Sequence, residues 1–262
     1  MLSLRQALSL NTIRNLGVVY PNQYSCEFDG VDDSVIVAQS AALRPTDELS
    51  ISLWMKPTTW NMTGASHKEY VFGCVRSGGW GIKLENNGSG HTTLRFEIKT
   101  VSSGYIYAVI DKDTTEAFTG WKNIIATYNE SSGLAKIYHN GSTTGTTNGT
   151  ATAGDTIGYH ASPLPIFIGA DAASATAGSD FFEGSVDEFS VFNIELSPDT
   201  ISRISDLPTD LTDETGLVGW WRMGDPNGTS SYPTIVDASS NTNNGTMDNM
   251  IAADITTDVP TP

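Results

Sequence analysis

The feature that most constrains this chain is a regular alternation at residues 49–57, LSISLWMKP. Its apolar positions are Leu49, Ile51, Leu53 and Met55. They fall on one face of an extended chain, because successive side chains of a β-strand point to opposite sides. Pro57 ends the run, since proline has no backbone N–H to donate to a neighbouring strand. A strand with one apolar face must bury it, and a second sheet is the expected partner where helix signals are few.

The rest of the chain has the same texture. Short runs of β-branched and aromatic residues, such as YVFGCV, TTLRFEIKT and WKNIIATYN, are separated by Gly, Asn, Asp, Ser and Thr. One short helix is predicted near residues 197–205, where Ser197 can cap the N-terminus and Pro198 suits the first helical position. We therefore predict an all-β fold, a two-sheet antiparallel β-sandwich with one short helix.

The charge balance excludes some classes of partner. The formal net charge is −16, with 14 Lys and Arg residues against 30 Asp and Glu. Nucleic acids and anionic membranes attract basic surfaces, so we expect neither as a partner. No run of apolar residues is long enough to span a membrane. Cys26 and Cys74 are too few for a secreted disulfide framework, and we expect two buried thiols, with a single bridge as the alternative.

Three regions are predicted along the chain. Residues 22–247 hold the strand-like runs, residues 1–21 form an N-terminal arm rich in Leu, and residues 248–262 form an acidic, extended C-terminal tail. The start of the chain does not resemble a signal peptide, because polar residues such as Arg5 interrupt its apolar stretch. We expect the arm and the tail to dock on subunits of a larger assembly. The alternative is that the arm folds back on its own sandwich.

Several segments, taken in order, carry a family resemblance. They are CEFDGVDDSVIV, LSISLWMKP, WKNIIATYNESSGLAKIYHNG, IFIGA, FEGSVDEFSVFNIELSPDTI and GLVGWWRMGD. Together they resemble the laminin-G-like family, a jelly-roll branch of the concanavalin A-like lectin/glucanase superfamily. The resemblance implies two face-to-face antiparallel sheets. It also implies a function among glycan binders, adhesion modules and structural spacers.

Three carboxylates in FFEGSVDEF raise the question of an active site. Glycosidases of the same superfamily carry carboxylates at alternate positions of one strand, so that they share a face. Here the alternate positions are Glu183, Ser185 and Asp187, and Glu188 is expected on the opposite face. The central carboxylate is therefore missing, and we predict no catalytic residues and no enzymatic activity.

The resemblance also implies a structural Ca²⁺ near the first hairpin. Its expected ligands are Asp29 and Asp33 of FDGVDD, together with Asp187 of the late strand. Ca²⁺ takes six to eight oxygen ligands, which turn carboxylates and carbonyls can supply. The alternative is that the hairpin aspartates only shape the turn through hydrogen bonds to its backbone, and that Asp187 bonds a neighbouring amide.

Glycan binding needs exposed aromatic rings with polar groups beside them. Trp60 and Trp80 are the first candidates, because loop-like segments adjoin them. Weaker candidates are Tyr105, Tyr107, His139 and Asn140. The alternative for each is ordinary packing.

These observations lead to one main hypothesis and two others. The main hypothesis is a non-enzymatic structural or binding module of a bacteriophage virion, in the capsid decoration or the tail, made in the host cytoplasm and binding host-surface glycans. The second is a secreted or surface carbohydrate-binding or adhesion protein. The third is a glycoside hydrolase-like enzyme.

Overall fold

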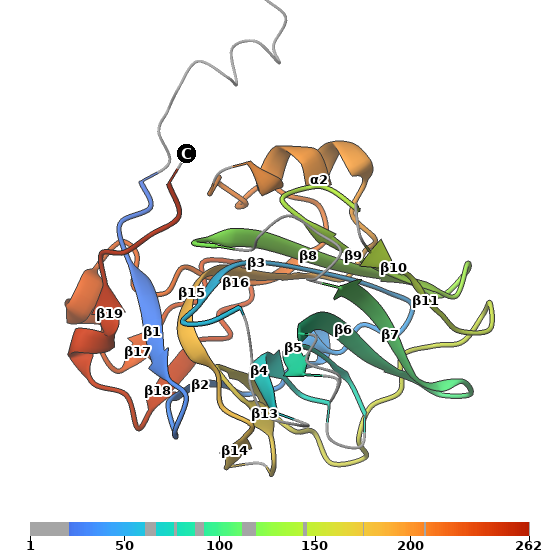
Figure 1. The fold of residues 1–262 in the computed structure, drawn as a ribbon, viewed down its shortest axis with the longest axis horizontal. Helices are drawn as coiled ribbons and strands as arrows, with labels where there is room; N and C mark the ends of the chain where they lie inside the picture. The colour runs from blue at the N-terminus through green and yellow to red at the C-terminus, as the bar shows by residue number, and fades with distance from the viewer. Residues whose placement is uncertain are drawn as a thin grey trace, which may run out of the picture.

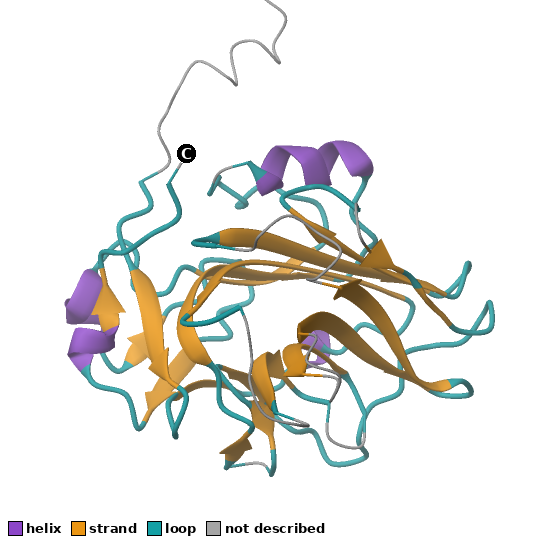
Figure 2. Cartoon of the chain, viewed as in Figure 1, coloured by secondary structure: helices purple, strands orange, loops and turns teal. Residues whose placement is uncertain are grey.

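The computed structural model of the chain describes residues 21–60, 67–75, 78–86, 92–111, 119–143, 146–174, 176–206 and 208–261. Two large antiparallel sheets lie one above the other and enclose the core (Figure 1). Strands dominate, and helix is confined to short segments (Figure 2). The predicted two-sheet sandwich is confirmed. Among the described residues, no helix combines the length and apolar character needed to cross a bilayer.

The first sheet contains eight strands. In spatial order they are β11 (Gly149–Thr150), β9 (Leu134–His139), β8 (Lys122–Asn129), β3 (Glu48–Pro57), β15 (Glu183–Phe192), β1 (Ser25–Asp29) and β19 (Ile255–Thr256), and β16 (Leu217–Trp221) also pairs with β15. Helix α2 (Pro198–Ser205) packs on the side of this sheet that faces away from the core (Figure 1).

The second sheet contains nine strands. In spatial order they are β10 (Thr146–Thr147), β7 (Gly104–Asp111), β6 (Thr92–Thr100), β5 (Trp80–Asn86), β4 (Lys68–Gly73), β12 (Ile166–Ile168), β2 (Ser34–Val37), β18 (Gly245–Asp248) and β17 (Thr234–Ile235). A small third sheet pairs β13 (Asp171–Ala172) with β14 (Gly178–Ser179). The 3-10 turns are η1 (Ala41–Leu43), η3 (Gly228–Ser231) and η4 (Ala252–Asp254).

Alternation along the strands decides which side chains enter the core. The apolar positions predicted from LSISLWMKP all lie fully buried between the sheets. Cys26 and Cys74 are free, buried thiols, as expected, and burial raises the pKa of Cys74 to about 12. The sandwich is therefore held by apolar packing, without a bridge between these cysteines.

Helix α2 forms where its start signals predict. The Ser197 hydroxyl accepts a hydrogen bond from the backbone N–H of Thr200 at 3.1 Å, and Pro198 occupies the first turn. Ile201 and Ile204 are buried against Trp220 in an apolar cluster on the outer face of the first sheet. The helix thus covers a large part of this face.

The C-terminal residues do not form the extended tail predicted from residue 248. Strand β18 runs to Asp248 and pairs with β2, and β19 pairs with β1 at the edge of the first sheet. The Ser25 hydroxyl also donates to the carbonyl of Asp258 at 2.7 Å. The prediction is wrong because acidic and proline-containing sequence can still be held by backbone pairing to an edge strand. The N-terminal arm up to residue 20 lies outside the described residues.

Candidate functional site

The acidic stretch of β15 contains a β-bulge. Its register with β3 shifts between Asp187 and Ser190, and Glu188 has a positive φ of 50°. Val186 and Phe189 both point into the core, so the two residues between them lie on the outer side. The expectation that Glu188 faces away from Asp187 is therefore wrong, because the bulge inserts one extra residue into the alternation.

Asp187 and Glu188 lie in a buried cluster of charged groups, with exposures of 0% and 5%. The Glu188 carboxylate accepts hydrogen bonds from Arg222 Nε at 3.1 Å and from Trp220 Nε1 at 2.6 Å. Burial raises the pKa of Glu188 to about 7, although Arg222 opposes the rise. Burial, followed by repulsion from Glu188, raises the pKa of Asp187 well above its usual range.

This cluster binds the segment that leads into β1. Asn22 Nδ2 donates to Asp187 Oδ2 at 2.8 Å, and the backbone N–H of Gln23 donates to Asp225 Oδ2 at 2.9 Å. Asp187 Oδ1 accepts from the neighbouring N–H of Glu188 at 2.7 Å, as its alternative interpretation predicted. Glycosidase carboxylates flank a bound substrate. The Asp187 and Glu188 carboxylates are instead hydrogen-bonded to protein groups inside the fold, so their role in this structure is to stabilise the fold.

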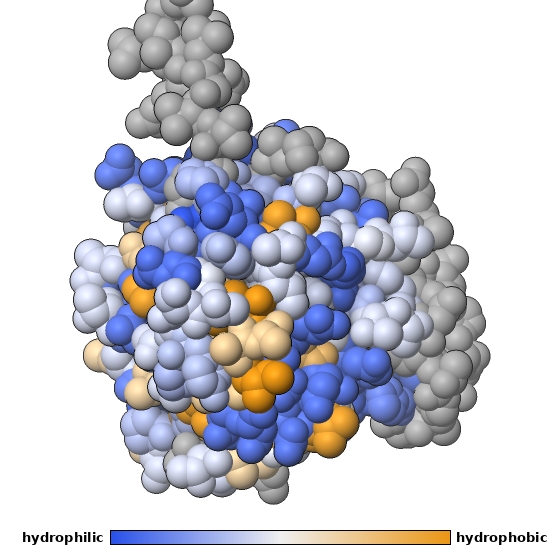
Figure 3. Space-filling model, turned by 90° about the vertical axis from the view of Figure 1, so that its left-hand side faces the viewer, coloured by the Kyte–Doolittle hydropathy of each residue, from blue (hydrophilic) through white to orange (hydrophobic). Residues whose placement is uncertain are grey.

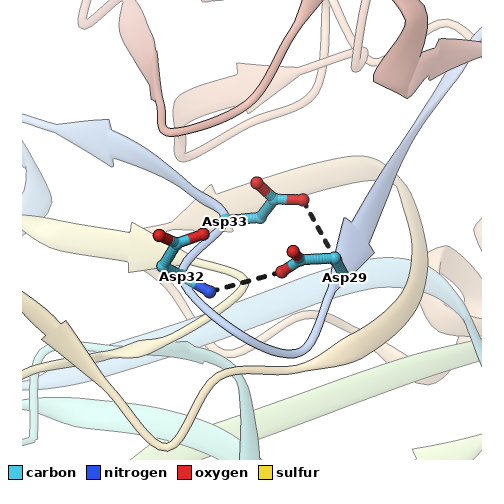
Figure 4. A group of neighbouring side chains, drawn as sticks. All are labelled: Asp29, Asp32 and Asp33. Atoms are coloured by element: carbon cyan, nitrogen blue, oxygen red, sulfur yellow. Dashed lines mark hydrogen bonds between the residues drawn. The ribbon is translucent and has the colours of Figure 1, made fainter.

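The hairpin between β1 and β2 gathers three carboxylates (Figure 4). Asp29, Asp32 and Asp33 each offer one oxygen, and these oxygens lie within 4.8 Å of one another. Asp29 Oδ1 also accepts from the backbone N–H of Val31 at 2.8 Å, and Asp33 Oδ2 accepts from that of Asp29 at 3.1 Å. Burial and the nearby Asp29 raise the pKa of Asp33 to about 6. The carboxylates thus shape the turn and also form an oxygen-rich group of the kind that suits Ca²⁺.

The predicted metal ligands are only partly brought together. Asp29 lies opposite Glu183 in the sheet, and Asp187 lies four residues further along β15, about 13 Å away at the rise of a β-strand. Asp187 is therefore not part of the hairpin group, and its place is taken by Asp32. Sequence reasoning assigned Asp32 only to the turn, although its position in DGVDD was the available signal.

The two tryptophans proposed for glycan stacking are buried. Trp80 is 0% exposed and begins β5 with its ring in the main core, where its Nε1 donates to the Tyr159 hydroxyl at 3.2 Å. Trp60 is 8% exposed and belongs to the same core. Both proposals are corrected, because a ring inside the core cannot stack on a sugar. The loop-like segments beside Trp60 and Trp80 suggested that both rings are exposed. A loop next to a residue does not determine whether its side chain points into the core.

His139 and Asn140 lie apart from the other candidates. They close strand β9 of the first sheet, whereas Tyr105 lies on β7 of the second sheet. Asn140 has a positive φ of 45°, and its Oδ1 accepts from the backbone N–H of Asn123 at 3.0 Å. Asn140 therefore shapes a turn, and the six residues predicted for glycan binding do not form one site.

Two tyrosines on β7 do share an accessible face. Tyr105 and Tyr107 stand two residues apart on the outer side of the second sheet, 36% and 38% exposed. Lys99 Nζ lies 4.8 Å from the centre of the Tyr105 ring. Lys83 Nζ and Arg95 Cζ each lie 5.8 Å from the centre of the Tyr107 ring. The rings are thus held beside cations, within the range of cation–π attraction.

Carboxylates fix these cations in place. Lys83 Nζ lies 2.8 Å from Glu97, and an Arg95 nitrogen lies 2.9 Å from Glu85. Burial by itself lowers the pKa of Lys83, but contacts with Glu97 and Glu85 outweigh burial and raise the pKa overall. The face combines half-exposed rings with fixed donors and acceptors, which is the chemistry that recognises sugar hydroxyls. We call Tyr105, Tyr107, Lys83, Arg95 and Lys99 the tyrosine face.

The cations of the tyrosine face were missed from the sequence. Their signal was the alternation in TTLRFEIKT, where Arg95, Glu97 and Lys99 fall on the side opposite to the apolar residues. The adjacent YIYAV places its tyrosines on the same side, because Lys99 pairs with Tyr105 and Glu97 with Tyr107 in the sheet. Pairing of the two alternating strands would have revealed the face.

A polar hollow of about 530 Å³ opens elsewhere on the sandwich. Its lining includes Arg44, Asp47, Glu48, Glu130 and Asn193. Among the described residues that line it, none is aromatic, so it lacks a ring on which a sugar could stack. The tyrosine face is therefore the better candidate for a glycan.

The profile of the concanavalin A-like lectin/glucanases superfamily, in its laminin-G-like form, matches residues 29–202. The chain belongs to this superfamily. The match contains β15 with its bulge, the hairpin between β1 and β2 with its three aspartates, and all three strands of the tyrosine face, β5, β6 and β7. No curated protein sequence gives a significant match.

Solved structures share the fold at low sequence identity. A provisionally assigned carbohydrate-binding protein from Bacteroides ovatus is 16% identical with a TM-score of 0.59, and the alignment covers 87% of this chain and 58% of that one. A heptameric SAP-like pentraxin from Limulus polyphemus is 16% identical with a TM-score of 0.51, covering 75% and 91%. The binding domain of botulinum neurotoxin DC, solved with SialylT, is 17% identical with a TM-score of 0.50, covering 72% and 43%. The chain thus spans little more than half of the Bacteroides protein.

Proposed function

We propose that this protein is a non-enzymatic carbohydrate-binding module and that the tyrosine face binds the glycan. The observation that carries the proposal is the pair of half-exposed rings, Tyr105 and Tyr107, set among Lys83, Arg95 and Lys99. Sugar rings stack on aromatic faces, and the flanking charged groups can bond hydroxyls. The carbohydrate-binding protein from Bacteroides ovatus, which has the same fold, adds support.

Tyr107 offers the sharpest test of this binding. A glycan array followed by calorimetry on the best ligand would give the affinity of the wild-type chain. We expect Tyr107→Ala to lower that affinity about tenfold or more, because an aromatic anchor is lost. Tyr107→Phe keeps the ring and should keep most of the affinity. Val101→Ala, at a position 66% exposed in the neighbouring turn, is the matched control.

Two results would contradict the proposal. One is the absence of any binding across the array. The other is a Tyr107→Ala variant that binds as tightly as the wild-type chain, which would place the glycan elsewhere. A screen for sugar release from polysaccharides, with Glu183→Gln as the comparison, tests the non-enzymatic part. Release that disappears in Glu183→Gln would show catalysis.

A structural Ca²⁺ at the first hairpin belongs to the same proposal. The donor set fits, since Asp29, Asp32 and Asp33 supply carboxylate oxygens close together and the partly buried Asp33 carboxylate sits beside two others. Such an ion would stabilise the hairpin and perform no chemistry.

The setting that we propose is the outside of a bacteriophage particle, as capsid decoration or part of the tail, with assembly in the host cytoplasm. A secreted or cell-surface adhesion protein is the alternative. The acidic net charge of −16 supports a displayed, highly soluble module in either setting. Mass spectrometry of purified phage particles tests the first setting. If the protein is absent from the particles and is recovered from the cell surface, the second setting is favoured.

A further inference from the structure

The three cations of the tyrosine face differ in how they are neutralised. Lys83 Nζ lies 2.8 Å from Glu97 and 3.4 Å from Glu85. An Arg95 nitrogen lies 2.9 Å from Glu85. Lys99 forms no ion pair with any described residue, and its ammonium lies 4.8 Å from the centre of the Tyr105 ring. Two carboxylates therefore balance two of the cations, and one positive charge is left at Lys99.

The sheet itself keeps carboxylates away from Lys99. The only acidic residue of β6 is Glu97, whose carboxylate lies 2.8 Å from Lys83 Nζ and accepts from the Tyr70 hydroxyl at 3.2 Å. On the β5 side, the backbone N–H of Lys99 donates to the carbonyl of Gly79, a residue with no side chain, at 2.8 Å. The Lys99 ammonium therefore keeps donors that a ligand can use.

Two other acidic residues lie beside β6 and β7. Asp155 accepts from the backbone N–H groups of Ser102 and Ser103, in the β6–β7 turn, at 2.8 and 2.6 Å. Asp111 ends β7, on the order of 20 Å from Tyr105 along the strand. The first carboxylate is thus bonded to the turn and the second is distant, so neither neutralises Lys99.

Exposed acidic residues gather at a different end of the sandwich. This end, formed by β1, β17, β18 and β19, faces the viewer in Figure 3, and most of its surface is hydrophilic. Glu27, Asp29 and Asp32 are exposed there, whereas β6 and β7 lie on the opposite side of the molecule in Figure 1. Charges further apart than the screening length, about 8 Å at physiological ionic strength, interact weakly. The net charge of −16 therefore permits a local attraction of anions to Lys99.

Tyr105 and Tyr107 form a platform beside this positive charge. They stand two residues apart on the same side of β7, about 7 Å along the strand. The Tyr105 hydroxyl donates to the carbonyl of Val75 at 2.9 Å, which holds the ring in place. A sugar that stacks on Tyr105 brings its substituents beside Lys99 without rearrangement of the face, and such preorganisation favours binding.

We propose that the glycan bound by the tyrosine face is acidic, and that Lys99 binds the carboxylate or sulfate group of the sugar that stacks on Tyr105. This inference rests on the proposed function of that face. An ammonium is a compact point charge with three donors, which suits either anionic group. A neutral sugar leaves Lys99 without a charged partner, so Lys99 determines specificity. Tyr107 lies beside cations that are already paired with carboxylates, and it serves acidic and neutral sugars alike.

Matched pairs of oligosaccharides test the proposal. Each pair contains a uronate or sulfated oligosaccharide and the same compound after carboxyl reduction or desulfation, printed on one array with neutral glycans. Calorimetry on the pairs that bind should give an affinity about tenfold or more higher for the acidic member. Equal or stronger binding of the neutral members would overturn the inference and leave the proposed function intact. An array on which no glycan binds would contradict both.

Substitutions at Lys99 sharpen the test. Lys99→Gln should lower the affinity for the acidic member about tenfold, to the level of the neutral member, and leave the neutral affinity unchanged. Lys99→Arg should keep the preference, because it keeps the charge. Tyr107→Ala should lower both affinities by the same factor, because the ring serves both ligands.

Lys136→Gln is the matched control. It also removes one positive charge, but on the outer side of the first sheet, where Lys136 pairs with Glu195 at 2.8 Å. It should leave both affinities unchanged, and circular dichroism shows whether each variant is folded. A preference for acidic members that survives in Lys99→Gln, or that is lost equally in Lys136→Gln, would overturn the assignment of the anion to Lys99.

Discussion

The outer face of the first sheet is closed, whereas the outer face of the second sheet keeps two tyrosine rings in contact with solvent. On the first sheet, Trp220 is 1% exposed beneath Ile201 and Ile204 of α2. On the second, Tyr105 and Tyr107 remain 36% and 38% exposed. Similar alternating strands build both faces, so the difference comes from the segment between β15 and β16, which covers only one of them.

This difference explains why carboxylates play different parts on the two faces. On the covered face, Asp187 and Glu188 are hydrogen-bonded to Asn22, Trp220 and Arg222. These bonds stabilise the segment that precedes β1. On the open face, carboxylates such as Glu85 orient cations beside exposed rings. Acidic residues on a strand therefore do not identify a site until it is known whether other parts of the fold cover them.

The largest effect is expected from Arg222→Ala on the closed face. This change leaves Glu188 buried without its charged partner, which typically costs about 3–5 kcal/mol of unfolding free energy. Urea denaturation at neutral pH measures the loss. The double variant Glu188→Gln with Arg222→Met should lose less than the two single changes together, because no uncompensated charge remains.

Arg203→Ala provides the matched comparison. Arg203 pairs with Glu214 at 2.5 Å on the outside of α2, but its side chain is 43% exposed. An exposed pair of this kind contributes about 1 kcal/mol or less. Equal losses for the Arg203 and Arg222 variants would show that the cover over the first sheet does not isolate Glu188 from water.

A smaller effect is expected at the hairpin that joins the two sheets, since β1 belongs to one and β2 to the other. Ca²⁺ at one hundred times its dissociation constant should raise the free energy of unfolding by about 2.7 kcal/mol. Asp33→Asn should abolish this gain, and Asp213→Asn, in an exposed loop, should keep it. A gain that survives in Asp33→Asn would place the ion elsewhere, and no gain in the wild-type chain would end the proposal of a Ca²⁺ site here.

The fold could be predicted because its main strands carry local signals. The alternation in β3 and the cap and proline of α2 each fix their element without long-range information. Strands β18 and β19 carry no such signal. They are four and two residues long, and only their pairing with β2 and β1 makes them strands. The acidic, proline-containing surroundings of β19 indicated a tail instead, whereas all of β18 except Asp248 lay within the predicted sandwich.

The candidate site was harder to predict because burial is a property of the whole fold. Trp80 looked accessible beside a glycine-rich loop, yet its place at the start of β5 turns the ring inward. Glu188 was assigned to the wrong face because a bulge at a residue other than glycine leaves little trace in the sequence. Tyr105 is accessible because its strand alternates between exposed and buried residues, and its part in glycan binding stays a prediction.

The smallest of the three effects concerns the protonation of Asp187. The unfolded chain loses this proton near pH 4, whereas in the folded state burial and repulsion from Glu188 raise the pKa of Asp187. Asp225, Arg222 and the Cys26 thiol are also nearby, but Arg222 is bonded to Glu188. The folded state therefore binds more protons above pH 4, and stability should fall as pH rises through this window.

Asp187→Asn should remove that slope, because an amide resembles the protonated acid and carries no charge. Asn22 Oδ1 is buried and has no hydrogen-bond partner among the described residues. A turn of the Asn22 amide lets this oxygen accept a hydrogen bond from neutral Asp187, or from the amide that replaces it. Relative to the wild-type chain, the variant should gain about 1–2 kcal/mol between pH 5 and pH 7. Asp213→Asn should show no such gain, and parallel pH profiles for all three chains would mean that Asp187 is ionised inside the fold.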